Sequence, residues 1–181
     1  AAGDALGTTL EFSTPDVPPF PARLDGPHRT VTGGGPFSLE PGEVTDDTHM
    51  ACCIAASLSE RAAFDPLDVL HRYRQWRRVA FDVGLQTAAA LDLASASPLG
   101  GGRVVWERRS GQKPAGNGSL MRTAPIGIYF AARDDERIAA SWADSSLTHY
   151  DPRCRFACVA FNGALAAGVQ GAATAGMLAA A

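Results

Sequence analysis

The chain has 181 residues, a length that allows one domain with a substantial hydrophobic core and is too short for two comfortable ones. Its apolar content of 46% and charged content of 19% are close to those of globular proteins, which argues against a disordered or membrane protein. The net charge of −3 argues against general nucleic-acid binding, which normally needs a basic face. The four cysteines lack the spacing of a zinc site or a disulfide framework, so reduced thiols in a cytoplasmic protein are expected.

Neither end of the chain has the pattern of a targeting or membrane segment. No basic stretch followed by an apolar run opens the sequence, so no signal peptide is expected. Residues 164–181 are weakly apolar and just long enough to cross a bilayer, but they are mostly Ala and Gly and include Gln170 and Thr174. A closely packed internal helix is therefore expected there, and no membrane partner.

The first half of the chain is predicted to pass from an irregular segment into helices. Residues 13–44 are rich in Pro and Gly and predict a long loop, which in a compact domain usually has a function. Residues 45–58 predict a helix that begins with a capping residue and acids. Its apolar positions recur every four residues at Met50, Ile54 and Leu58.

Two further helices are predicted before a break in the pattern. Asp65 and Pro66 have the order expected of an N-cap and a first helical residue. The apolar stripe of this helix is formed by Val69, Tyr73, Trp76 and Ala80. Another helix is predicted over residues 82–95, with Asp82 most simply its cap, and residues 98–118 are expected to be irregular.

The second half is also expected to be helical, from about Ser119 and again over residues 134–145. A last long helix is predicted from Asp151 and Pro152, with one face formed by Cys154, Cys158, Phe161 and Leu165. Alternating strand patterns are absent, so the predicted fold class is all-α.

The segment Thr45-Asp46-Asp47-Thr48 is a candidate metal site. It offers only hard oxygen ligands, which suit Mg²⁺ or Mn²⁺ rather than zinc. Adjacent side chains on a regular helix diverge by about 100°, so both acids converge on a metal only at a helix start. The alternative is that acids and Thr stand here for capping and for the helix dipole alone.

The segment Gly116-Asn117-Gly118-Ser119 is a candidate anion-binding loop. A glycine-rich turn that enters a helix exposes backbone N–H groups, and the helix N-terminus favours a phosphate. An Asn-Gly turn before an ordinary helix has the same sequence. Three single residues have several possible roles or a simple one. Asp4 is a cap, a buried hydrogen-bond partner or a base, His149 is structural or functional, and Asp82 is most simply a cap.

Taken in order, five segments resemble the ADP-ribosylglycohydrolase family, including its dinitrogenase-reductase-activating type. They are Gly-Asp-Ala-Leu-Gly with Glu11 following, Thr-Asp-Asp-Thr from Thr45, Asp-Val-Gly-Leu-Gln-Thr from Asp82, Gly-Asn-Gly-Ser-Leu-Met-Arg from Gly116, and Thr-His-Tyr-Asp-Pro-Arg-Cys from Thr148. The resemblance covers nearly the whole chain. It implies a compact orthogonal helical bundle in one domain over residues 1–181.

The resemblance also implies a site for two Mg²⁺ or Mn²⁺ ions at the base of an ADP-ribose cleft. By position, Thr45, Asp46 and Asp47 correspond to metal ligands, and Glu11 with the two aspartates to catalytic residues. The substrate-binding positions implied in the same way are Asp82 near the leaving group, the diphosphate loop Gly116, Asn117, Gly118, Ser119 and Met121, and His149 beside the ribose.

The implied activity is metal-dependent hydrolysis that removes ADP-ribose from a side chain, with arginine as the default, or from a small molecule. A non-catalytic ADP-ribose-binding module and a structural, crystallin-like relative are the alternatives. Members of the family continue into an Asp-x-Asp-Thr segment that completes the metal site. Nothing after Leu165 has that sequence, so the domain is expected to be a fragment of a longer protein.

Overall fold

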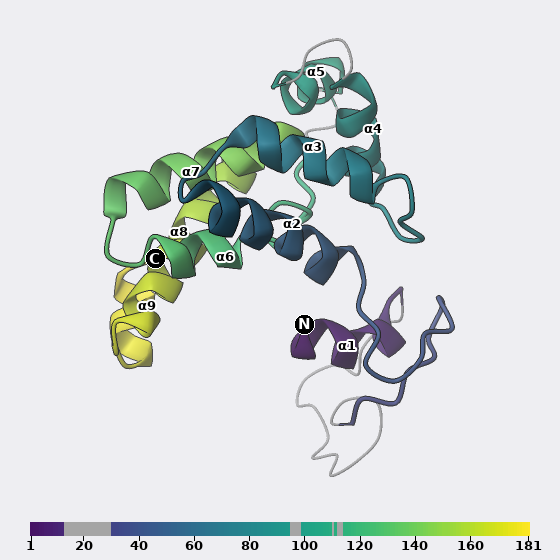
Figure 1. The fold of residues 1–181 in the computed structure, drawn as a ribbon, viewed down its shortest axis with the longest axis horizontal. Coiled ribbons are helices and arrows are strands. Elements are labelled where there is room, and N and C mark those ends of the chain that lie inside the picture. Colours follow the sequence, from purple (N-terminus) through teal and green to yellow (C-terminus); the bar gives the residue numbers. More distant parts are fainter. Residues whose placement is uncertain (13–29, 95–98, 110, 112–113) are drawn as a thin grey trace. The chain divides into compact units, whose positions relative to one another are not determined.

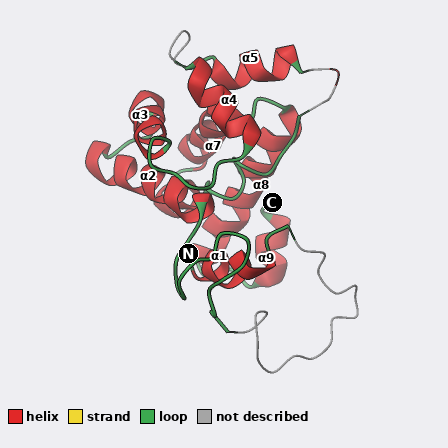
Figure 2. Cartoon of the chain, turned by 90° about the vertical axis from the view of Figure 1, so that its right-hand side faces the viewer, coloured by secondary structure: helices red, strands yellow, loops and turns green. Residues whose placement is uncertain are grey.

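The computed structural model describes residues 1–12, 30–94, 99–109, 111 and 114–181. In these ranges every regular element is a helix, and the one β-type contact is an isolated antiparallel bridge between Gly34 and Leu39 (Figures 1 and 2). The all-α prediction is confirmed. Residues 13–29 of the predicted loop and the last residue of the helix predicted over 82–95 lie outside the described residues.

The chain separates into two compact units, Ala1–His49 and Met50–Ala181. The first contains helix α1 (Ala2–Gly7), the short 3-10 helix η1 (Thr8–Leu10) and the irregular residues 30–44. Helix α2 (Asp46–Arg61) begins in the first unit and supplies most of its length to the second. The predicted helix start at the acidic segment is therefore confirmed.

The second unit is a set of packed helices. They are α3 (Pro66–Trp76), α4 (Leu85–Leu93), α5 (Gly101–Arg108), α6 (Ala124–Tyr129), α7 (Asp134–Thr148), α8 (Pro152–Val169) and α9 (Thr174–Ala179). Helices α7 and α8 lie side by side, α6 and α9 pack against α8, and α4 and α5 pack on each other and on α7 (Figure 1). None of the described helices is long and apolar enough to cross a membrane.

Part of the core of the second unit is built from residues that the sequence pattern identifies. Met50, Ile54 and Leu58 of α2 are all buried, and they join Val69 and Tyr73 of α3 in one cluster. The predicted α3 stripe is correct over these first positions. Trp76 is only partly buried against the cluster, and Ala80 lies beyond the end of the helix.

The two predicted cap-plus-proline starts are confirmed. The Asp65 carboxylate accepts hydrogen bonds from the backbone N–H groups of Leu67 (2.9 Å) and Asp68 (3.1 Å) at the start of α3. The Asp151 carboxylate accepts from the N–H of Arg153 (2.9 Å) at the start of α8. Both caps are local features, because the acceptor and the donors lie within three residues of each other.

The sequence does not predict helix α5, because the run of glycines at its start is typical of a chain break. The structure shows that Gly101 and Gly102 serve close packing instead. A Cβ at Gly101 would collide with the carbonyl of Ala90, and one at Gly102 with the carbonyl of Ser146. The glycines therefore bring α5 against α4 and α7.

Two boundaries also differ from prediction in this region. Asp82 is not a helix cap, since α4 begins at Leu85 and its N-cap is Gly84. The helix expected from about Ser119 begins at Ala124, and turns occupy the residues between them.

The buried face of α8 differs from the predicted one. Cys154 and Cys158 are buried as expected, but the face continues through Asn162 and Ala166. Phe161, which was assigned to it, is 41% exposed. The tail is not one internal helix either: α8 ends at Val169, and the short α9 that follows has no buried residue.

We expect Asp65→Ala to lower the free energy of unfolding by about 1 kcal/mol, because two N–H groups of α3 lose their acceptor. Urea denaturation monitored by circular dichroism measures the change. Asp135→Ala is the matched control, since Asp135 is an exposed acid in the first turn of α7 and α7 has no side-chain cap. Equal losses in the two variants would contradict a specific capping role for Asp65.

Candidate active site

Asp4 of α1 caps the start of α2 from a distance of more than forty residues in sequence. Its carboxylate accepts hydrogen bonds from the backbone N–H groups of Thr45 (3.0 Å) and Thr48 (3.2 Å). It also accepts from the Thr45 hydroxyl (2.9 Å). Of the three roles that the sequence left open for Asp4, the geometry supports the cap.

The two aspartates that follow Thr45 lie in the first turn of α2, beside Asp4. Asp46 is 8% exposed and Asp47 is half-buried. Burial raises the pKa of Asp47, and the negative charge of Asp4 raises it further, while a hydrogen bond from the Thr45 hydroxyl (3.4 Å) opposes both. Carboxylates are thus crowded in a partly buried place, where a nearby positive charge would be stabilising.

The chemistry of this helix start suits a hard cation. Thr45, Asp46 and Asp47 offer hydroxyl and carboxylate oxygens, which Mg²⁺ and Mn²⁺ prefer. Within the ranges that the structure describes, no group of three or more His, Cys, Asp or Glu side chains is arranged to hold a metal ion. The assignment of these three residues as ligands therefore stays a prediction, as does the catalytic role of Glu11, which lies exposed directly after η1.

The predicted anion-binding loop, residues 116–121, belongs to the second unit. The N–H groups of Leu120 (2.7 Å) and Met121 (3.1 Å) donate to the carbonyl of Asn117, which forms a turn in place of the expected helix start. Among the described residues no backbone carbonyl accepts from the N–H groups of Gly118 and Ser119. These two amides, together with the exposed Gly116 and Asn117, are the part of the loop suited to an anion.

Met121 differs from its neighbours in this loop. Its side chain packs against the hydrophobic core, and its N–H is used within the turn. The structure therefore places Met121 as an anchor of the loop, and its predicted contact with substrate stays a prediction.

His149 lies against the glycines of this loop. A Cβ at Gly118 would lie 2.7 Å from the Cε1 atom of His149 and 3.0 Å from its Nε2 atom, so only glycine fits there without a shift. His149 is 2% exposed, its Nδ1 lies 2.9 Å from the Thr148 hydroxyl, and its backbone N–H donates to the Ser145 carbonyl (2.7 Å). The structure thus brings together the loop and the histidine that the sequence singled out separately.

Burial, and then the positive charge of Arg122, lower the pKa of His149 to about 3. The imidazole is therefore neutral at physiological pH. A neutral ring gives a hydrogen bond without adding a charge, so His149 is suited to binding a hydroxyl and unsuited to supplying a proton as a general acid.

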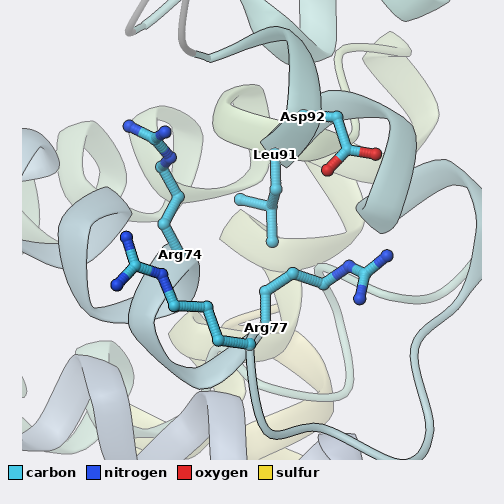
Figure 3. A pocket seen from close by; sticks show the side chains of 5 residues that line it. Arg74, Arg77, Leu91 and Asp92 are labelled. Atoms are coloured by element: carbon cyan, nitrogen blue, oxygen red, sulfur yellow. The ribbon is translucent and has the colours of Figure 1, made fainter.

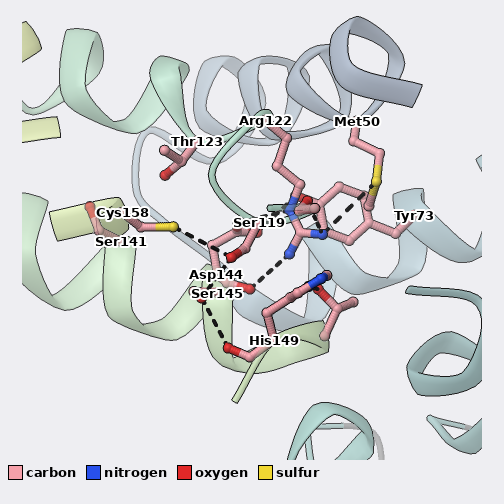
Figure 4. Close-up of polar contacts among 12 residues, drawn as sticks. Met50, Tyr73, Ser119, Arg122, Thr123, Ser141, Asp144, Ser145, His149 and Cys158 are labelled. Atoms are coloured by element: carbon pink, nitrogen blue, oxygen red, sulfur yellow. Dashed lines mark hydrogen bonds and ion pairs between the residues drawn. The ribbon is translucent and has the colours of Figure 1, made fainter. Parts of the chain in front are cut away.

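A buried ion pair lies beneath the loop (Figure 4). The Nε of Arg122 donates to an Asp144 carboxylate oxygen at 3.0 Å, and both side chains are fully buried. Another guanidinium nitrogen donates to the main-chain carbonyl of Asp144 (3.0 Å), and a third to the carbonyl of Gly118 (3.3 Å). The Tyr73 hydroxyl donates to the other carboxylate oxygen (2.8 Å), and the guanidinium stands 4.6 Å from the centre of the Tyr73 ring.

Hydroxyl and thiol contacts extend this network along α7 and to one more helix, α8. The Ser145 hydroxyl of α7 donates to that of Ser119 (2.9 Å), and the Cys158 thiol of α8 lies 3.5 Å from the same oxygen. Sequence reasoning missed Arg122, Asp144 and Ser145 as site residues. The available signal was the helical spacing of polar residues in α7, at Ser141, Asp144, Ser145 and Thr148, all of which are buried.

Asp82 lies half-buried in the segment between α3 and α4. The Gln86 side chain, one turn later, donates to the carbonyl of Thr148 (3.3 Å), which ties the start of α4 to the residue before His149. The role of Asp82 near a leaving group stays a prediction.

The fold and these features define an all-α protein with an acidic helix start and a glycine loop supported by a buried histidine and ion pair. The family model of the ADP-ribosylglycohydrolases matches residues 1–181, and the chain belongs to this family. The resemblance inferred from five short segments is thereby confirmed.

Several relatives carry names that specify a substrate. The chain is 34% identical to an ADP-ribosylarginine hydrolase Tri1 of Pseudomonas putida over 82% of its own length and 39% of the relative's. It is 29% identical to the ADP-ribosyl-[dinitrogen reductase] glycohydrolase of Rhodospirillum rubrum, over 88% of its own length and 51% of the relative's.

A solved structure described as an ADP-ribosylglycohydrolase-related protein complex matches with a TM-score of 0.74 and 31% identity. It covers 99% of this chain and 58% of the solved chain. The chain thus spans between about two fifths and three fifths of the length of these relatives.

We expect Arg122→Met to lower the free energy of unfolding by about 3–5 kcal/mol, because it leaves the buried Asp144 carboxylate without its counter-charge. Chemical denaturation measures the loss. Arg103→Met, which removes an exposed ion pair with Glu107, is the control and should cost far less. The double variant Arg122→Met/Asp144→Asn should recover part of the loss, and a double variant less stable than either single one would contradict this account.

We expect the His149 ring to remain neutral between pH 5 and pH 8, so its NMR Hε1 signal should not shift over that range. The His149→Gln variant identifies the signal by its disappearance. The unfolded chain takes up a proton at this histidine near pH 6.5 and the folded chain does not. His149 should therefore reduce stability as pH falls from about 6.5 towards about 3. A midpoint near 6.5 in the folded protein would refute the assignment.

Proposed function

We propose that the protein is a metal-dependent hydrolase that removes ADP-ribose from modified arginine side chains. Family membership and the names of the relatives support the reaction class. The observation that carries the metal dependence is the first turn of α2. There, Asp46 and Asp47 stand in partly buried positions, and the pKa of Asp47 is raised by burial and by the charge of Asp4.

Substrate binding would use the second unit. The N–H groups of Gly118 and Ser119 suit the diphosphate of ADP-ribose, and Arg122, whose charge is paired with Asp144, holds the loop through the Gly118 carbonyl. Where the Thr148 hydroxyl donates to Nδ1 of His149, Nε2 carries the hydrogen and can donate to a ribose hydroxyl. The partners in this proposal are ADP-ribosylated protein as substrate and ADP-ribose as product.

Cleavage of the bond at C1″ of the ribose passes through an oxocarbenium-like state and needs an activated water. Two Mg²⁺ or Mn²⁺ ions held by Thr45, Asp46 and Asp47 would orient the ribose hydroxyls and acidify a bound water. Glu11 would take the proton from the attacking water, and Asp82 would stabilise the departing guanidine.

We also expect the protein to act in the cytoplasm, where its four cysteines, all free in the structure, stay reduced.

We expect Asp47→Asn to lower the hydrolysis of ADP-ribosyl-arginine by at least about a hundredfold, because an amide is a far weaker ligand for a hard cation than a carboxylate. Release of ADP-ribose in the presence of Mn²⁺ or Mg²⁺ is the measurement. Asp135→Asn is the matched control, as it changes an exposed acid at the start of another helix.

The same preparations distinguish the alternatives. EDTA should abolish hydrolysis by the unaltered protein, and Glu11→Gln should slow it without preventing ADP-ribose binding in a calorimetric titration. Hydrolysis that is insensitive both to EDTA and to Asp47→Asn would overturn the metal-dependent mechanism. Binding of ADP-ribose without any hydrolysis would favour the non-catalytic module.

A further inference from the structure

A cavity of about 240 Å³ lies between the end of α3 and the helix α4 (Figure 3). It is lined by Arg74, Arg77, Arg78, Leu91 and Asp92. Three guanidinium groups against one carboxylate give the lining a net positive charge, in a chain whose overall charge is −3. The sequence segments that resemble the family do not include any of these arginines.

Within the part of the chain that the structure describes, Arg77 contributes a buried N–H group without an acceptor to the wall of this cavity. Its Nε is buried and donates to no acceptor among the described residues. A buried donor without an acceptor is destabilising, and native proteins rarely contain one. Arg72, five residues earlier in α3, is by contrast paired with Asp68 (2.7 Å) and Glu60 (2.6 Å).

The helix dipole does not account for this arrangement. The C-terminal end of a helix favours cations, which explains one basic residue in the last turn of α3. It does not explain two further arginines past the last helical residue, at the edge of a cavity that they line together with Asp92. An occupant with a negatively charged group that accepts hydrogen bonds would supply an acceptor to the buried Arg77 Nε and a counter-charge to the neighbouring arginines.

The position of the cavity connects it to the proposed reaction. Its two walls, α3 and α4, are joined by the segment that carries Asp82. Arg78 precedes Asp82 by four residues, so at most about 14 Å of extended chain separates them. Two side chains of one substrate protein, one held in the cavity and the other near Asp82, would therefore be only a few residues apart in the sequence of that substrate.

We propose that this cavity binds a Glu or Asp side chain of the ADP-ribosylated protein, close in sequence to the modified arginine. The inference rests on the proposed function and adds the substrate class: arginines in acidic surroundings. Guanidinium groups bind carboxylates through paired, charge-assisted hydrogen bonds. Asp92 in the lining disfavours a doubly charged phosphate more than a singly charged carboxylate.

The test uses the double variant Arg77→Gln/Arg78→Gln and three substrates. These are free ADP-ribosyl-arginine, a peptide with ADP-ribosyl-arginine flanked by glutamates, and the same peptide with glutamines. Relative to the unaltered protein, kcat/KM for the glutamate peptide should fall about three- to twentyfold, through KM and most strongly at low salt. For the other two substrates the change should stay below about twofold. Arg77→Lys/Arg78→Lys should restore part of the loss, and Arg103→Gln is the exposed control.

A second measurement keeps this inference separate from the proposed function. Fluorescence anisotropy of the labelled glutamate peptide without ADP-ribose should show weaker binding to Arg77→Gln/Arg78→Gln than to the unaltered protein. If no substrate is hydrolysed, the proposed function fails while this binding difference still supports the cavity. Equal binding, or an equal loss of activity on all three substrates, overturns the inference. Displacement of the peptide by inorganic phosphate as effectively as by glutamate would assign the cavity to phosphate instead.

Discussion

The ion pair between Arg122 and Asp144 is the interaction on which the second unit depends. Two charges removed completely from water cost several kcal/mol each, and their attraction offsets this only with good geometry and full hydrogen bonding. The pair obtains these partners from three places: the Tyr73 hydroxyl, the main-chain carbonyl of Asp144 and the carbonyl of Gly118. Helices α3 and α7 and the glycine loop are therefore held in one arrangement, because moving any of them leaves a charge underpaired.

This arrangement has two electrostatic consequences for the loop. The carbonyl of Gly118 is directed inward to Arg122, while its N–H is used by no backbone acceptor among the described residues. The same positive charge helps to keep His149 neutral, although burial is the larger cause. The Gly118 and Ser119 amides have no backbone acceptor among the described residues, and the histidine beside them is uncharged. Because the ion pair of Arg122 and Asp144 holds this loop in place, its amides are arranged for an anion before any ligand arrives, which lowers the cost of binding.

The parts of this structure that the sequence predicts are those decided by nearby residues. The caps at Asp65 and Asp151 and the buried spacing of Met50, Ile54 and Leu58 each depend on a few turns of one helix. Helix α5 and the buried face of α8 depend on partners far along the chain. Gly101 resembles a chain break until the carbonyl of Ala90 is placed beside it, and Asn162 is buried because it bonds Thr123 and Ser141 (both 2.8 Å).

The same distinction decides how the acidic segment at α2 is interpreted. From the sequence, one interpretation of Asp46 and Asp47 is that they stand there for capping and for no other purpose. In the structure the N–H groups of Thr45 and Thr48 bond to Asp4 instead, a contact 41 to 44 residues apart that no local pattern contains. Because Asp4 supplies the cap, capping gives no reason for two more partly buried acids in the same turn, one of them with a raised pKa. Burial and the charge of Asp4 both disfavour the ionised form of Asp47, and a cation bound there, as proposed above, would favour that form.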